Sequence, residues 1–236
     1  MARILRRSGA NFEMIGHDGN TAASYLFGNT RPQTPQTEFI DILACNSFSQ
    51  FNAQDTNGWT ILHRAAAWGI AADVRRLLQM NASTESRTYK LAWTPLFCAV
   101  CHKNFETLQE LWNSGDDLDL REQQDVRGWN LLHVAAGCGN FEAIPYLLER
   151  GVSLEAISKP ASRLVPPPVR GKSVTPAEVA RSCGEAAYAK WNEALKAAGP
   201  GVEPGRSEID WKAEATDTRL GECECCDSWD APPSIY

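Results

Sequence analysis

The sequence lacks the long hydrophobic runs that membrane-spanning proteins contain. No stretch of its 236 residues approaches the roughly 20 consecutive apolar residues of a transmembrane helix. Residues 1–12 carry three arginines but no apolar core of signal-peptide length, and the acids Glu13 and Asp18 follow too closely for a typical mitochondrial transit peptide. We therefore expect an intracellular protein, cytoplasmic or nuclear, that does not bind a membrane.

Paired cysteine motifs are also missing. Five of the eight cysteines are scattered singly, and the other three, Cys223, Cys225 and Cys226, form one cluster. This spacing excludes the disulfide framework of a small secreted domain. A structural zinc site takes four ligands, and no second cysteine pair follows the cluster, so we predict no metal and no cofactor. The sequence leaves open whether these three thiols bind a metal.

Positive charge is scarce as well. The net charge is −6, and residues 199–236 alone contain nine acidic and three basic residues, which accounts for all of the excess. The rest of the chain is neutral overall. Because binding to phosphates needs a basic face, a neutral body with an acidic tail argues against a nucleic-acid partner.

What the sequence does contain is an internal repeat. Four segments align: "GWTILHRAAAWG" at 58–69, "AWTPLFCAVCHK" at 92–103, "GWNLLHVAAGCG" at 128–139 and "SVTPAEVARSCG" at 173–184. Their equivalent positions are 34, 36 and 45 residues apart, so the last spacing implies an insertion. An apolar stretch with the i, i+3, i+4 pattern of a helix face follows each of the first three segments. Each unit is thus predicted to be a turn, a short helix, a second turn and a longer helix.

These units resemble the ankyrin repeat, whose pattern is G-x-T-P-L-H-x-A-A-x-x-G. The first segment matches it through Gly58, Thr60, Leu62, His63, Ala65, Ala66 and Gly69, and the third through Gly128, Leu132, His133, Ala135, Ala136 and Gly139. The second segment departs from it with Phe97 in place of histidine, and the fourth with Glu178. The resemblance implies an all-α solenoid of about four stacked helix-turn-helix units whose terminal units are degenerate.

The resemblance also suggests how the chain is organised. Residues 1–35 form an N-terminal segment that can contribute to a degenerate capping repeat, residues 36–198 the ankyrin-repeat domain, and residues 199–236 an acidic tail expected to be disordered. Clear repeats are expected near 55–87, 88–121, 125–156 and 173–198, with an insertion loop at 157–172.

The histidines of the pattern invite a catalytic interpretation, because His63 and His133 could act as bases. Nothing in the sequence places a nucleophile and an orienting carboxylate around either ring. The resemblance implies instead that these histidines join neighbouring turns by hydrogen bonds. We therefore predict structural roles for both, and for the helix-capping side chains of the four repeats, Thr60, Thr94, Asn130 and Thr175.

Two other sets of repeated positions are candidate binding residues. One set directly precedes the capping residues and consists of Trp59, Trp93 and Trp129; the resemblance places it on exposed turns that face a concave groove. The other set shares a position deeper in that groove and consists of Trp68, His102 and Cys138. Tryptophan is enriched in interface hot spots, so we predict a non-enzymatic adaptor or scaffold that binds a protein or peptide there.

Three further readings stay open. In the first, the tryptophans simply pack on their neighbours. In the second, the groove binds or converts a small molecule with the help of Cys101 and His102. In the third, Trp211 and Trp229 of the acidic tail occupy the groove while the tail's acids meet four bases of the insertion, so that the tail binds its own chain. These bases are Lys159, Arg163, Arg170 and Lys172. The partner's identity and the oligomeric state are not predicted.

Overall fold

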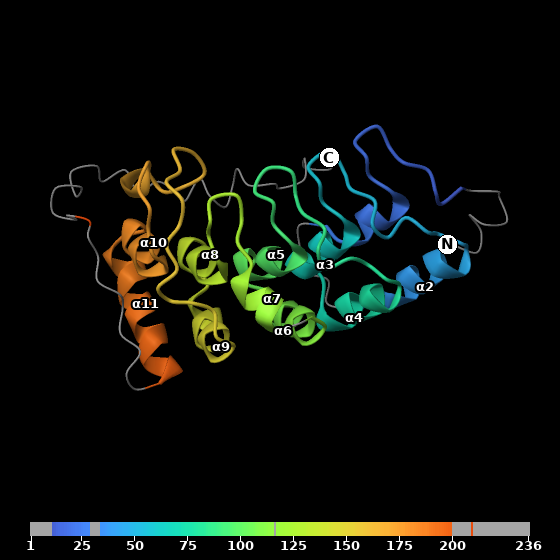
Figure 1. Ribbon diagram of the computed structural model, residues 1–236. Coiled ribbons are helices and arrows are strands. Elements are labelled where there is room, and N and C mark those ends of the chain that lie inside the picture. The colour runs from blue at the N-terminus through green and yellow to red at the C-terminus, as the bar shows by residue number, and fades with distance from the viewer. Residues whose placement is uncertain (1–10, 29–33, 116, 200–208, 210–236) are drawn as a thin grey trace. The chain divides into compact units, whose positions relative to one another are not determined.

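The computed structural model describes residues 11–28, 34–115, 117–199 and 209, in two compact units, Met1–Asp116 and Asp117–Tyr236 (Figure 1). Throughout these described ranges helices alternate with loops and no β-strand occurs, so the all-α prediction is confirmed. None of the described helices has the length and apolar character needed to cross a bilayer. Apart from Gly199 and Ile209, the acidic tail lies outside the described residues, and so do Trp211, Trp229 and the three clustered cysteines.

The first unit consists of helices arranged in two layers (Figure 1). They are η1 (Ala22–Leu26), α2 (Thr37–Cys45), α3 (Ile61–Trp68), α4 (Ala71–Gln79), α5 (Pro95–Cys101) and α6 (Phe105–Asn113). The first helices of successive repeats pack together, α3 against η1 and α5, and the second helices do the same, α4 against α2 and α6. η1, a 3-10 helix, and α2 therefore lie where the sequence places a degenerate N-terminal repeat.

The second unit repeats the same arrangement. Its helices are α7 (Asp117–Glu122), α8 (Leu131–Gly137), η2 (Phe141–Ala143), α9 (Ile144–Glu149), η3 (Pro167–Val169), α10 (Pro176–Ser182) and α11 (Glu185–Ala198). α8 packs against α10, and α9 packs against α11. Pro145 lies in the first turn of α9, where its missing amide hydrogen costs little.

Small side chains allow the first helices to approach one another closely. Ala65, Ala66 and Ala67 of α3 are fully buried, and the hydroxyl of Thr107 donates to the carbonyl of Ala66 (2.7 Å). The amide of Asn104 donates to the carbonyl of Gly69 (2.8 Å). These bonds join α3 to the turn and first residues of the next repeat's second helix, so each repeat is held by polar contacts as well as by packing.

A hairpin loop precedes the first helix of each repeat. In these four repeats a backbone amide closes the loop by donating to a backbone carbonyl. The pairs are Asp55 to Trp59 (2.9 Å), Thr88 to Trp93 (2.9 Å), Asp125 to Trp129 (3.0 Å) and Ser158 to Val174 (2.9 Å). The last pair shows that the inserted residues occupy the tip of the fourth hairpin.

Neighbouring hairpins stack tightly on one another. In the first unit the amide of Tyr89 donates to the carbonyl of Asn57 (2.9 Å). Gly58 has a φ of +82°, and a Cβ atom there would lie 2.7 Å from the amide nitrogen of Tyr89. Glycine is therefore required at this turn for its backbone conformation and for the close approach of the next loop.

Candidate binding surface

The tryptophans that were expected to face an open groove are buried. The exposed fraction is 2% for Trp59 and 1% each for Trp93 and Trp129. The expectation of exposed rings is therefore wrong. The physical reason is the large apolar area of an indole, which is stabilised when the ring turns inward beneath its hairpin and contacts other rings. Direct contact between a partner and these three rings is not available on this surface.

One cluster of aromatic rings does bring predicted residues together. Trp59 stacks on Trp68, with centroids 5.3 Å apart and planes inclined by 12°. His102 contacts Trp68 edge-on at 4.9 Å and lies 6.3 Å from Trp59. Trp68 is buried, whereas His102 is only half-buried. The structure thus unites three of the six predicted binding residues, and His102 is the member of this cluster that solvent reaches.

The remaining three candidates have different surroundings. In the first unit Trp93 stacks on Phe97, with centroids 6.2 Å apart. In the second unit Trp129 lies under the guanidinium of Arg127 at 3.8 Å and beside His133 at 5.8 Å. Cys138 is the buried C-terminal cap of α8.

His63 is held at both ring nitrogens. Its Nδ1 accepts a hydrogen bond from the backbone amide of Thr60 (3.1 Å), so the ring proton lies on Nε2, which donates to the carbonyl of Trp93 (3.0 Å). The hydroxyl of Thr60 in turn accepts from the amide of His63 (3.4 Å). His63 therefore caps its own helix and joins it to the next hairpin.

His133 has the same geometry in the second unit. Its Nδ1 accepts from the amide of Asn130 (3.2 Å), and its Nε2 donates to the carbonyl of Val174 (2.9 Å). Burial lowers the pKa of both histidines from 6.5 to about 4, because a charged ring would lose its hydration. A neutral ring with both nitrogens engaged and no exposed surface has no site from which to accept a substrate proton.

Where a repeat lacks the pattern's histidine, another side chain braces the hairpin in its place. Where histidine is replaced by Glu178, the carboxylate accepts from the amide of Thr175 (2.9 Å). In the N-terminal repeat the hydroxyl of Ser24 accepts from the amide of Thr21 (3.1 Å). In the second clear repeat, Phe97 gives up this polar contact and stacks on Trp93 instead. The position therefore braces the hairpin by different chemistry in each repeat.

The aspartates that open the hairpins are buried with arginine partners. One carboxylate oxygen of Asp55 accepts from the amides of Asn57 and Trp59, both at 2.9 Å, and the other accepts from Arg64 at 2.8 Å. The same Arg64 nitrogen donates to Asn20 of the preceding repeat (3.1 Å). Both partners of the ion pair are almost completely buried. Asp55 is thus an anchor for its own loop and for the neighbouring one.

The sequence reasoning missed the residues that the hairpin tips do expose. Tyr89 is 65% exposed at a tip in the first unit, and Val126 is 50% exposed at a tip in the second. Ile157, which directly precedes the closing residue Ser158 of the fourth hairpin, is 66% exposed. The signal was present in the alignment, since Tyr89 and Val126 occupy the tip position that Thr56 fills in the first clear repeat. These exposed apolar side chains are therefore candidates for contact with a partner.

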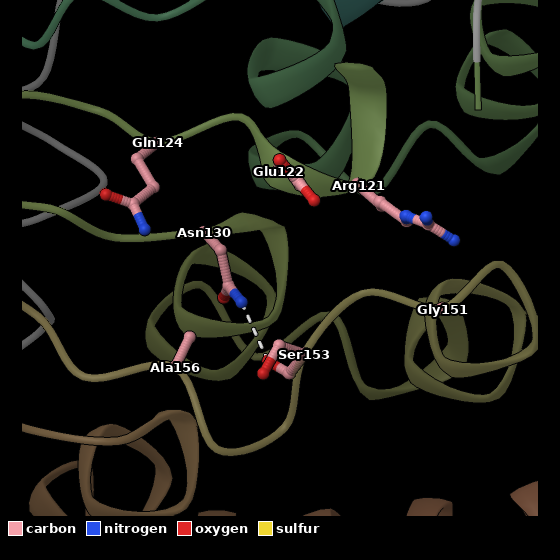
Figure 2. A pocket seen from close by; sticks show the side chains of 7 residues that line it. All are labelled: Arg121, Glu122, Gln124, Asn130, Gly151, Ser153 and Ala156. Atoms are coloured by element: carbon pink, nitrogen blue, oxygen red, sulfur yellow. Dashed lines mark hydrogen bonds between the residues drawn. The ribbon is translucent and has the colours of Figure 1, made fainter. Parts of the chain in front are cut away.

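A polar pocket of about 380 Å³ lies in the second unit (Figure 2). It is lined by Arg121, Glu122, Gln124, Asn130, Gly151, Ser153 and Ala156. Of these, Asn130 is buried; its carbonyl accepts from the first amides of α8, and its amide donates to the carbonyl of Ser153 (2.8 Å). The side chain is therefore committed to structure. The residues that line this pocket include none of Cys101, His102 and Cys138, which were predicted for a small-molecule site in the groove.

Comparison with known proteins agrees with this geometry. Residues 81–158 match the family model "Ankyrin repeats (3 copies)". The chain is 31% identical over 127 residues to transient receptor potential cation channel subfamily A member 1 of Homo sapiens, covering 54% of this chain and 11% of that protein. It is 28% identical over 150 residues to alpha-latrotoxin-Lg1a of Latrodectus geometricus, covering 63% and 10%. It is 27% identical over 115 residues to rabankyrin-5 of Mus musculus, covering 49% and 10%.

The chain spans only about a tenth of the length of each of these relatives. What it shares with them is therefore a repeat region. The matched family, the helical pairs in two layers and the histidine-braced hairpins agree with one another, and residues 81–158 of this chain are ankyrin repeats.

Proposed function

We propose that this chain binds a protein or peptide partner, as an adaptor or scaffold, through the tips of its hairpin loops. Ankyrin repeats are in general protein–protein interaction modules, and residues 81–158 of this chain match three of them. In the first unit the principal contact is Tyr89. In the second unit the exposed apolar side chain at the corresponding hairpin tip is Val126.

The observation that carries the proposal is an exposed tyrosine on a fixed backbone. The amide of Tyr89 bonds to Asn57, and its loop is closed by the amide of Thr88 and by the amide of Trp93, which donates to the Thr88 hydroxyl (3.1 Å). A partner that binds a loop already ordered does not lose the entropy of ordering it. Tyrosine offers apolar area and a hydroxyl at a small entropic cost, which is why it is common in hot spots.

The earlier candidates take an indirect part in this proposal. Trp59 and Trp68 are buried, so they can act on a partner only by positioning His102, whose ring packs against both. Cys138 stays a predicted binding residue of the second unit. None of these side chains is required for the contact proposed for Tyr89.

Replacing Tyr89 with serine is expected to weaken partner binding at least tenfold while leaving the fold intact. The substitution removes an exposed ring but keeps every backbone bond of the loop, so its cost falls on binding, about 1.4 kcal/mol or more. The measurement is quantitative affinity capture from a native lysate with wild-type and variant protein, together with the helical circular dichroism of both.

The matched control is Phe39→Ser, which removes another exposed aromatic ring of the first unit, on α2. It is expected to capture the same partners as the wild type. Undiminished capture by the Tyr89 variant, or an equal loss in the Phe39 variant, would contradict the proposal.

We further propose that the acidic tail competes with the partner for the hairpin tips of the second unit. The burial of Trp59, Trp93 and Trp129 removes the exposed aromatic groove in which Trp211 and Trp229 were expected to lie. The charge complementarity between the tail and the insertion is what still supports it.

A further inference from the structure

The insertion at 157–172 is an ordered lobe at the tip of the fourth hairpin. The amide of Gly171 donates to the carbonyl of Ala161 (2.8 Å), which joins its two limbs. Arg127 of the third hairpin donates to the carbonyl of Leu164 (2.5 Å), and Val165 and Val169 are buried. The short helix η3, which contains Val169, contacts α10. The lobe is therefore fixed to the repeats by apolar packing and by hydrogen bonds.

Val165 and Val169 point inward, whereas the basic side chains lie at the surface of the lobe. Lys159, Arg163 and Arg170 are exposed, and Lys172 is half-buried, with its ammonium group donating to the carbonyl of Pro168 (3.1 Å). No acidic residue occurs between Glu155 and Glu178. The Ala161–Gly171 bond joins the limbs, and each of the four bases lies within two residues of this bonded pair along the chain. We call this part of the lobe the basic platform.

We propose that this basic platform is the docking site of the chain's own acidic segment, residues 203–230. That segment carries all nine acids of the tail, and the platform carries four bases with no acid among them. Docking of the tail would regulate partner binding, and only this regulatory role rests on the proposed function. The docking itself does not depend on whether a partner exists.

The connection between the two is short enough for intramolecular docking. The tail begins after α11, which packs against α10, and α10 contacts the lobe through η3. A random coil of about 30 residues spans about 30 Å on average, which is enough to reach a site one helix away. A tethered segment also has an effective concentration near the millimolar range, which favours docking even when each contact is weak.

Salt should weaken this contact strongly. The bases Lys159, Arg163 and Arg170 are exposed, so their attraction to carboxylates is screened over about 10 Å at 0.1 M salt and over about 3 Å at 1 M. A partner bound through apolar hairpin tips would be affected far less. This difference separates tail docking from partner binding.

Carbodiimide cross-linking of the full chain tests the proposal, because it joins a carboxylate to a lysine amine only where they touch. We expect cross-links from Lys159 and Lys172 to acids of residues 203–230, with yields at least fivefold lower in 0.5 M sodium chloride. Lys190 is exposed and lies closer to the tail in sequence, on α11, so it measures random encounter and should be linked much less.

The double variant Arg163→Ser with Arg170→Ser should reduce the Lys159 cross-links at least threefold, while Arg121→Ser, at another exposed arginine of the second unit, should not. Equal linking of Lys190 and Lys159, or yields unaffected by salt, would overturn the inference. A mixture of nitrogen-15-labelled and unlabelled protein tests for a second copy, since mixed-isotope products would place another chain's tail on the lobe. No partner is used, so failure here leaves the Tyr89 result untouched.

Discussion

Replacing Asp55 with alanine is expected to lower the free energy of unfolding by about 3–5 kcal/mol. The substitution leaves the charge of Arg64 buried without its carboxylate and removes the acceptor of two backbone amides, those of Asn57 and Trp59. Loss of one partner of a buried pair costs more than the pair contributes, since the remaining charge cannot recover its hydration. Urea unfolding followed by circular dichroism measures the change.

Glu110→Ala is the control within the same unit. Glu110 pairs with Arg75 at 2.6 Å, but the arginine side chain is 59% exposed. A solvated pair of this kind contributes about 0–1 kcal/mol, so this variant should unfold close to the wild type. Equal destabilisation by the two substitutions would show that burial of the Asp55–Arg64 pair is not what makes it important.

Acidification from pH 7 to pH 5 is expected to destabilise the protein by about 2 kcal/mol for each of His63 and His133. Their pKa is about 4 in the folded chain against 6.5 for an ordinary histidine. Below pH 6.5 the unfolded chain therefore binds protons that the folded chain excludes. The stability that the neutral rings provide is fully present above that pH and is lost as the pH falls toward 4.

The double variant His63→Phe with His133→Phe should make stability between pH 7 and pH 5 much flatter. Phenylalanine already stands at the equivalent position 97, so the repeat accepts the ring. At pH 7 the variant should be less stable, because the bonds to Trp93 and Val174 are lost. The exposed His17, replaced by glutamine, is the control. If the double variant lost as much stability on acidification as the wild type, the buried histidines would not be the cause.

The architecture could be predicted from the sequence because every repeat carries the same pattern of residues. The capping positions recur at nearly constant spacing, and an apolar helical face follows each of the first three. A segment whose own pattern is weak can therefore be assigned by aligning it with the other repeats. Even the departure at Glu178 kept the capping function, since a carboxylate accepts the same amide bond as a neutral imidazole.

The surface was harder to predict, because position in a repeat does not fix the direction of a side chain. Trp59 belongs to an exposed hairpin, yet its ring stacks on Trp68 of the following helix. That contact depends on the rotamer and on the bulk of a residue nine positions away. Tyr89, on an equivalent hairpin, has its ring in solvent.

The insertion shows a second limit of sequence reasoning. Its prolines and bases are typical of a solvated loop, but Val165 and Val169 give it a small core. Two isolated valines have no periodicity to reveal them, and the bond from Arg127 to Leu164 joins segments far apart in the chain. Only tertiary structure shows that the bases share a platform.

Site-specific photo-cross-linking tests the central claim, that partners bind at the hairpin tips, most directly. A photoreactive phenylalanine analogue is placed at position 89 in one sample and at position 39, on the surface of α2, in another, and both are irradiated in native lysate. The account predicts a discrete protein adduct from position 89 that is absent from position 39 and is competed by unlabelled wild type but not by Tyr89→Ser. Adducts from position 39 alone, or no competable adduct from position 89, would contradict it.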